Sequence, residues 1–167
     1  MRALYAFRVA GLLYGADVLQ IQEVCPCPPI TPVPQAPAVI RGLANLRSHI
    51  YLVLDMRAII GRPPQPLDAE CRLVVIKPGI AGDLGLVVER GVDIVHVQVR
   101  QIELPPKGAE SDVLASLFPN VCRMESDIMT VMDLAALASV VQAHYGATPR
   151  TTTSTRAIAP HSRETSQ

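Results

Sequence analysis

The stretch GLANLRSHIYLVLDMRAIIG, residues 42–61, carries most of the information about the fold. Two aliphatic segments, 40–46 and 50–54, flank a short polar turn with the sequence RSH at 47–49. Aliphatic runs of this length that are joined by a tight polar turn are typical of paired β-strands. The stretch therefore predicts a β-hairpin.

A predicted helix follows this hairpin directly. Asp55 precedes the short apolar segment 56–60, and an Asp at that position accepts N–H bonds from the first helical turn. Gly61 stands where the end of a helix needs a left-handed residue. Asp55 and Gly61 are therefore interpreted as structural caps, and not as groups that take part in chemistry.

The same pattern occurs again 78 residues later. NVCRMESDIMTVMDLAALA, residues 120–138, aligns with residues 42–60 at five identical positions, and Asp133 is again expected to cap a helix. Gly42 is read as a structural cap like Asp55 and Gly61. Asn120 stands opposite it in the second copy, and Asn tolerates positive φ better than most residues with a side chain. Chance agreement between aliphatic segments is the alternative. The shared order favours two similar small barrels, with a groove between them that suits a partner's helix.

The rest of the chain is consistent with a mainly β protein. The segment 25–37 contains six prolines, which lack the N–H that a central strand needs, so it is expected to be a loop or an edge. Further strands are expected at 3–9, 16–24, 72–77, 84–88, 92–97 and 128–132, and helices at 113–117 and 134–144.

These elements predict one folded unit and a tail. Residues 1–146 are expected to form two lobes, the second centred on about 70–132. From residue 147 onward Thr, Ser, Pro and Arg dominate, so residues 147–167 are predicted to be disordered.

Composition excludes several classes of function. The chain has 167 residues, of which 49% are hydrophobic, with 15 basic and 15 acidic residues. Binding to nucleic acid needs a surplus of positive charge, which is absent here. No apolar run approaches the roughly 18 residues of a membrane-spanning helix. We expect a cytoplasmic protein that neither binds nucleic acid nor inserts into the membrane.

The cysteines and histidines form no recognisable reactive motif. Cys25 and Cys27 are spaced as C-x-C rather than C-x-x-C, and Cys71 and Cys122 are isolated. We interpret all four as reduced, mostly buried small side chains. No catalytic residue, metal or cofactor is expected, although a small barrel that binds a metabolite or metal at the Pro-Cys loop is a less favoured alternative.

Three segments, taken in order, resemble the CheW family of chemotaxis coupling proteins. They are YAFRVAGLLYGADVLQIQEV (5–24), TPVPQAPAVIRGLANLRSHIYLVLDMRAIIG (31–61) and LGLVVERGVDIVHVQVRQIELPP (84–106). The positions that match the family's long middle signature are Pro34, Pro37, Ile40, Gly42, Asn45, Leu46, Arg47, Asp55, Arg57 and Gly61. Three positions depart from the family pattern: Ser48 replaces a glycine, Leu52 a proline and Glu89 an aspartate.

The resemblance implies a fold and a set of partners. It implies two SH3-like five-stranded β-barrels with short helices and a C-terminal helix. It also implies a non-catalytic adaptor that binds the regulatory domain of a CheA-type histidine kinase and the cytoplasmic helical tip of a chemoreceptor. A CheW-like scaffold of a twitching or other non-flagellar kinase pathway is the alternative that stays within the family.

The resemblance also selects candidate partner-binding residues. Arg47 matches the family's signature arginine, and a guanidinium at a turn can donate to a carboxylate or to the carbonyls at a helix end. Ser48 adjoins Arg47, and the amide of Asn45 is expected to bond the turn backbone. Glu23 is expected to orient Arg47 or to face a partner, and Ile21 belongs to the same segment.

Overall fold

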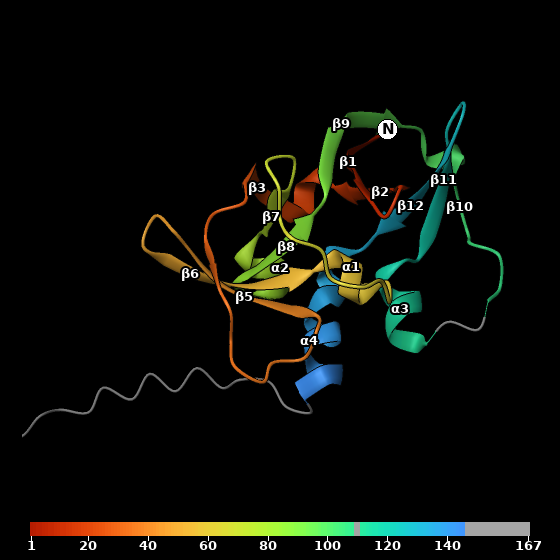
Figure 1. The fold of residues 1–167 in the computed structure, drawn as a ribbon. Coiled ribbons are helices and arrows are strands. Elements are labelled where there is room, and N and C mark those ends of the chain that lie inside the picture. Colours follow the sequence, from red (N-terminus) through yellow and green to blue (C-terminus); the bar gives the residue numbers. More distant parts are fainter. Residues whose placement is uncertain (109–110, 146–167) are drawn as a thin grey trace, which may run out of the picture.

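The computed structural model describes residues 1–108 and 111–145, and the tail predicted at 147–167 lies outside them. The described residues form two six-stranded β-sheets with short helices between strands. In Figure 1 one sheet lies to the left, the other to the upper right, and helix α4 (Leu137–Tyr145) lies beneath. The expected mainly β fold is confirmed, and each sheet has six strands where five were expected.

Within each sheet the strands are given in spatial order, so that neighbours in the order are hydrogen-bonded to each other. Sheet A contains β10 (Ile102–Glu103), β11 (Asn120–Arg123), β12 (Ile128–Met132), β2 (Leu12–Asp17), β1 (Arg2–Val9) and β9 (Arg90–Val97). Sheet B contains β3 (Ile21–Pro26), β7 (Arg72–Ile76), β8 (Leu84–Val88), β6 (His49–Asp55), β5 (Ile40–Leu46) and β4 (Ile30–Thr31). The remaining helices are η1 (Val18–Gln20), α1 (Met56–Ile59), α2 (Pro78–Ala81), η2 (Val99–Gln101), α3 (Asp112–Leu117) and η3 (Leu134–Ala136).

The chain divides between the sheets differently from the expectation of a second lobe centred on 70–132. The hairpin of β7 and β8 joins sheet B, where β7 pairs with β3 and β8 pairs in parallel with β6. The hairpin of β1 and β2 joins sheet A, where β1 pairs with β9 and β2 pairs in parallel with β12. Each half of the chain therefore contributes its first hairpin to the other half's sheet. The order of elements along the sequence could not reveal this exchange, because the exchange depends on which strands pair with one another.

The repeat seen in the sequence is also present in three dimensions. In the parallel pairs, Val53 lies opposite Gly85, and Val131, 78 residues after Val53, lies opposite Gly15. The N–H of Asp55 donates to the carbonyl of Val39 and that of Asp133 to the carbonyl of Leu117, each at 2.9 Å. Val39 and Leu117 are also 78 positions apart.

Three apolar clusters hold the sheets together. One lies inside sheet A and contains Leu4, Ala6, Leu13, Val97, Cys122, Met129 and Val131. One lies inside sheet B and contains Ala44, Tyr51, Val53, Leu73, Val75 and Val87. The shared cluster lies between them and includes Phe7, Tyr14, Leu54, Val74, Ile76, Leu86, Met132, Leu134 and Val140. Strands such as β7 and β8 contact an inner cluster with one face and the shared cluster with the other, which explains their unbroken aliphatic sequences.

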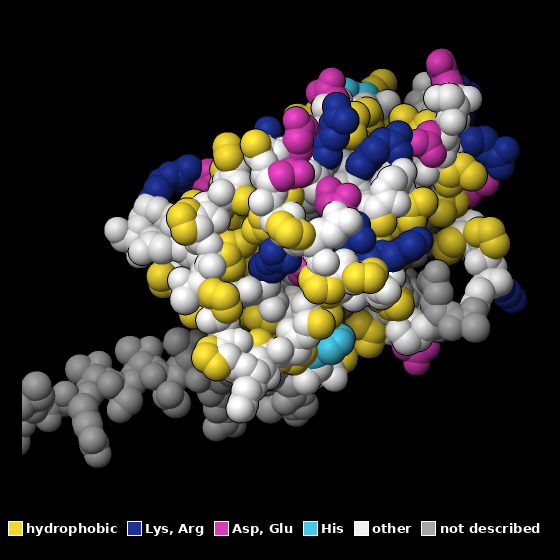
Figure 2. Space-filling view, viewed as in Figure 1, with side chains coloured by type: hydrophobic (Ala, Val, Ile, Leu, Met, Phe, Trp, Pro, Cys, Tyr) yellow, Lys and Arg dark blue, Asp and Glu magenta, His cyan; other side chains and the backbone are white. Residues whose placement is uncertain are grey.

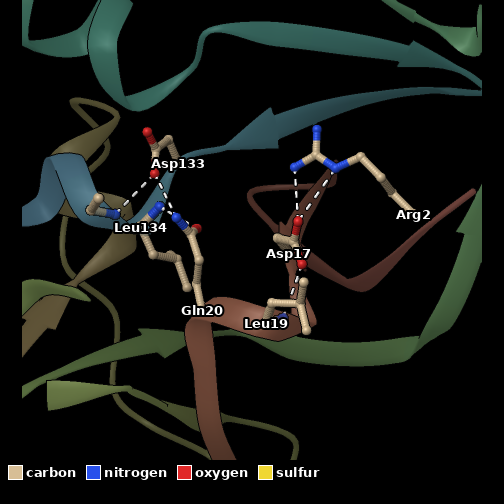
Figure 3. A network of polar contacts seen from close by, with 7 residues as sticks. Arg2, Asp17, Leu19, Gln20, Asp133 and Leu134 are labelled. Carbon is tan, nitrogen blue, oxygen red and sulfur yellow. Dashed lines mark hydrogen bonds and ion pairs between the residues drawn. The ribbon is translucent and has the colours of Figure 1, made fainter. Parts of the chain in front are cut away.

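The chain crosses between sheets at η1, within the segment that the sequence suggested was a single strand at 16–24. The Asp17 side chain accepts the Leu19 N–H at 2.9 Å and receives two hydrogen bonds from Arg2. Figure 3 shows the Gln20 side chain reaching from η1 to the start of the C-terminal helical segment. Gln20 donates to Asp133 at 2.7 Å and accepts the Leu134 N–H at 2.9 Å.

The second crossing, between β8 and β9, is held by charged groups. Glu89 accepts the Ala10 N–H from the turn between β1 and β2 at 3.1 Å, and it forms an ion pair with Arg57 of α1. Arg57 also donates to the carbonyl of Pro63 at 2.8 Å. The Glu89 carboxylate therefore connects the β1–β2 turn of sheet A to helix α1, which follows strand β6 of sheet B.

Helix α1 is capped at both ends. Buried Asp55 accepts the Arg57 N–H at 3.0 Å and receives a hydrogen bond from Arg41 at 3.1 Å. At the other end Gly61 has φ +75°, and its N–H donates to Ala58 while the N–H of residue 62 donates to Arg57. This pair of bonds is a Schellman motif. In the second copy, Asp133 accepts the N–H of residue 135 at 3.1 Å.

Gly42 is not a cap, because it lies inside β5 beside a register shift and has φ +149°. A Cβ there would lie 2.2 Å from the carbonyl oxygen of Thr31 in β4, so glycine permits the close approach of the two strands. Asn120 has no positive φ, so its expected likeness to Gly42 is wrong. The register differs as well, because β11 pairs with β12 without the shift that β5 shows against β6.

Replacing Gly42 tests this close approach. We expect Gly42→Ala to lower the free energy of unfolding by about 1–3 kcal/mol, because backbone atoms of Thr31 must move. Urea denaturation followed by circular dichroism measures the change. Gly79→Ala is the control, since Gly79 has open space around its Cβ position. Equal midpoints for the two variants would contradict the explanation.

Replacing Gln20 tests the first crossing. We expect Gln20→Ala to lower the free energy of unfolding by about 1–3 kcal/mol, because it leaves the Leu134 N–H without its partner. The exposed Gln142 of α4 gives a matched control, for which Gln142→Ala is expected to change stability by less than about 0.5 kcal/mol. Thermal denaturation followed by circular dichroism measures both variants. If Gln20→Ala melts at the same temperature as wild type, the hydrogen bond to Leu134 does not stabilise the crossing.

Candidate functional site

The turn between β5 and β6 has an unusual backbone. Leu46 and His49 form the last strand pair, and the two residues between them have positive φ, +51° at Arg47 and +66° at Ser48. Positive φ at both central positions defines a type I′ turn, for which Asn-Gly is the preferred sequence. Two residues with side chains therefore occupy left-handed positions here, at a cost in stability.

Glu23 holds the Arg47 side chain in place. Arg47 donates to both carboxylate oxygens, at 3.1 Å through Nη1 and 2.6 Å through Nη2. Hydrogen bonding to Glu23 and its negative charge raise the pKa of Arg47. The Arg47 side chain is 76% exposed, whereas that of Glu23 is only 22% exposed. A fixed guanidinium therefore faces solvent with donors that Glu23 does not use.

The structure brings together some of the predicted residues and separates others. Glu23 of β3 and Arg47 are in direct contact, and exposed Ser48 adjoins them. Asn45 is exposed on β5 opposite Ile50, and within the described residues its side chain makes no hydrogen bond, so its expected bond to the turn is not found. Ile21 is half-buried and packs against the shared cluster between the sheets.

Exposed apolar residues beside the turn were not among the predicted site residues. We call the exposed end of the β5–β6 hairpin the hairpin face; it comprises Leu43, Asn45 and Ile50. Leu52, the cross-strand partner of Leu43, is half-buried and packs against the shared cluster between the sheets. Ile50 is 52% exposed and Leu43 38% exposed. The alternation in HIYLVLD contained the signal, because Tyr51 and Val53 turn inward.

Charged and apolar groups are mixed on the surface. Figure 2 shows hydrophobic side chains interspersed with Lys, Arg, Asp and Glu over the face in view.

Among the residues with described positions, no three His, Cys, Asp or Glu side chains are grouped as metal ligands. None of the described helices is long and apolar enough to cross a membrane.

One pocket, beside α1, is lined by charged side chains that pair with one another. It lies between α1 and the segment 65–71, and its lining includes Arg41, Asp55, Arg57 and Glu89. Arg41 pairs with Asp55, and Arg57 pairs with Glu89. These four charges stabilise one another and the fold, so the hairpin turn and its neighbours form the better candidate site.

Comparisons with known proteins agree with this arrangement. The family model for the CheW-like domain matches residues 4–142. The chain is 30% identical over 134 residues to the chemotaxis protein CheW of Rhizobium meliloti, which spans 80% of this chain and 84% of that one. It is 26% identical over 102 residues to the protein PilI of Pseudomonas aeruginosa, spanning 60% of this chain and 57% of that one.

A solved structure has the same fold. The scaffolding protein TtCheW from Thermoanaerobacter tengcongensis superposes with a TM-score of 0.70 and 25% sequence identity, covering 80% of this chain and 89% of that one. Since the family model covers nearly all of the described residues, the resemblance seen in the sequence is confirmed. The chain belongs to the CheW-like family of non-catalytic scaffold proteins.

Proposed function

We propose that this chain couples chemoreceptors to a CheA-type histidine kinase in bacterial chemotaxis. Membership of the CheW-like family supports this, as does the similarity to a chemotaxis protein over most of both chains. In this proposal the chain works in the cytoplasm beside membrane receptors. Its partners are the cytoplasmic helical tip of a receptor and the regulatory domain of the kinase.

The observation that carries the proposal is the fixed, exposed guanidinium of Arg47. Glu23 restrains it by two hydrogen bonds, so a partner binds Arg47 with a smaller loss of side-chain entropy than a free arginine would suffer. Its remaining donors suit a carboxylate or the carbonyls at a helix end. Beside it, the hairpin face offers Leu43 and Ile50 for apolar contact.

The proposed mechanism is geometric. An adaptor that binds two proteins at once holds them at high effective concentration and in a fixed orientation. Small displacements of a receptor tip then change the position of the kinase and so its rate of autophosphorylation. The adaptor contributes binding surfaces, and the kinase contributes the chemistry.

A pathway for twitching motility is the second candidate. The similarity to the protein PilI favours it. A pull-down from the native host with the tagged chain as bait distinguishes the two pathways. The kinase that is recovered belongs either to a chemotaxis system or to a pilus system.

Charge reversal at Arg47 tests the proposed surface. We expect Arg47→Glu to weaken binding to the receptor tip or to the kinase by about tenfold or more, because it removes the donors and repels Glu23. The measurements are partner affinity and kinase autophosphorylation in a mixture of receptor, kinase and adaptor. Circular dichroism on the same sample checks that the protein is folded.

Arg90→Glu is the matched control for this experiment. Arg90 is 69% exposed and pairs with Glu70 at 3.7 Å, so the change in charge and exposure is similar but lies away from the hairpin turn. Equal losses in both variants would indicate a non-specific effect of charge. Unchanged coupling in Arg47→Glu would reject the assignment of Arg47.

The turn itself yields a separate prediction. We expect Ser48→Gly to raise the free energy of unfolding by about 0.5–1 kcal/mol, because glycine adopts φ +66° without strain. The contact between Arg47 and Glu23 remains, so a change in coupling of more than about twofold would assign the Ser48 side chain itself to the partner surface. Thermal denaturation and the kinase assay measure the two effects. A destabilised variant would show that the Ser48 side chain contributes contacts to the turn.

A further inference from the structure

Two cysteines lie opposite each other at the open end of the β3–β7 pair. The register places Cys25 opposite Leu73 and Pro26 opposite Arg72, so the next position places Cys27 opposite Cys71. In antiparallel strands, residues directly opposite each other have side chains on the same face. Cys27 also packs against the inner cluster of sheet B, which contains Leu73, two residues from Cys71.

This geometry is close to that of a cross-strand disulfide. Opposed residues in an antiparallel pair have Cβ atoms about 4.5–5.5 Å apart. A disulfide needs about 3.5–4.5 Å, so only a small approach of the strands is required. Cys27 and Cys71 lie one residue beyond the paired ladder, because β3 ends at Pro26 and β7 begins at Arg72, so their approach breaks no ladder hydrogen bond.

The surroundings of the two thiols favour this pairing over others. Cys71 is buried and Cys27 is half-buried. Cys122 lies in the inner cluster of sheet A, with the sulfur of Met124 at 3.9 Å. Cys25 shares a face with Cys27, but its direct neighbour across the strands is Leu73.

We propose that Cys27 and Cys71 are a modification site, at which a low-molecular-weight disulfide such as oxidised glutathione converts the two thiols into a reversible cross-strand disulfide. One protein thiolate attacks the glutathione disulfide, forms a mixed disulfide and releases one glutathione. The other protein thiolate then attacks the protein sulfur of that mixed disulfide and releases the second glutathione. The two released glutathione thiolates take up the two protons that the cysteines lost.

Electrostatics determine how this site reacts. Burial, followed by the nearby thiols of Cys71 and Cys25, raises the pKa of Cys27 to about 12. Because thiolate is the attacking species, the dithiol reacts slowly at neutral pH. A thiol of high pKa is also a poor leaving group, so the disulfide is released slowly and resists reduction. The site therefore responds to a sustained change in redox conditions and not to a brief one.

The cross-link would join two proline-rich segments that line one groove. Pro28 and Pro32 lie on one side of this groove, and Leu67 and Asp68 lie on the other. The covalent loop of residues 27–71 contains the hairpin that carries Arg47. Oxidation thus restrains the segment that presents the proposed partner surface, although the cross-link itself does not depend on that proposed function.

The experiment equilibrates the full chain in glutathione buffers of increasing oxidation, with acid quenching, alkylation of free thiols and mass spectrometry. We expect wild type to lose the mass of two hydrogens and to retain two of its four free thiols. The oxidised form should melt roughly 5 °C or more above the reduced form, because a long loop has been closed. Cys25→Ala and Cys122→Ala should retain the bridge.

The variants Cys27→Ala and Cys71→Ala should both lose the bridge and stop at a mixed disulfide with glutathione. Cys27 is only half-buried, so Cys27→Ala gives the result even where replacement of buried Cys71 impairs folding. Four free thiols in the most oxidising buffer would overturn the proposal. A bridge that persists in Cys27→Ala, or that disappears in Cys25→Ala, would overturn it in favour of a Cys25 pairing.

Discussion

Two parallel strand pairs, β6 with β8 and β12 with β2, join the two halves of the chain. Through them, each half of the chain places its first hairpin in the middle of the other half's sheet. The inserted strands are covered on both faces, by an inner cluster and by the shared cluster. The two sheets consequently share one large core, and the crossings at Gln20 and Glu89 fix how one sheet continues into the other.

This buried framework supports a strained but well-held surface feature. Arg47 and Ser48 adopt left-handed backbone at the tip of the β5–β6 hairpin, where glycine would be preferred. Glu23 comes from β3, at the far side of the same sheet in strand order, and yet its carboxylate meets the Arg47 guanidinium. The curvature of sheet B makes this contact possible. An exposed cation that is held by a rigid sheet is well suited to protein recognition.

The charged side chains around helix α1 and the two Asp caps serve the fold. The charges of the pocket beside α1 are paired with one another, and Asp55 and Asp133 accept backbone N–H groups as helix caps. What the chain offers to other proteins is therefore shape, apolar contact and an oriented guanidinium. The paired thiols near the proline-rich segments add a covalent means of restraining that shape.

The β5–β6 hairpin, the Asp-capped helix and its end at Gly61 could be predicted from the residues, because the spacing of neighbouring residues sets their backbone conformation. The repeat at an offset of 78 was visible as a shared order of elements. The exchange of hairpins, the close approach of β4 to Gly42 and the contact of Glu23 with Arg47 became apparent only in three dimensions. These depend on strand pairing and sheet curvature between distant segments. Aliphatic strands buried on both faces carry little information about which neighbour they will choose.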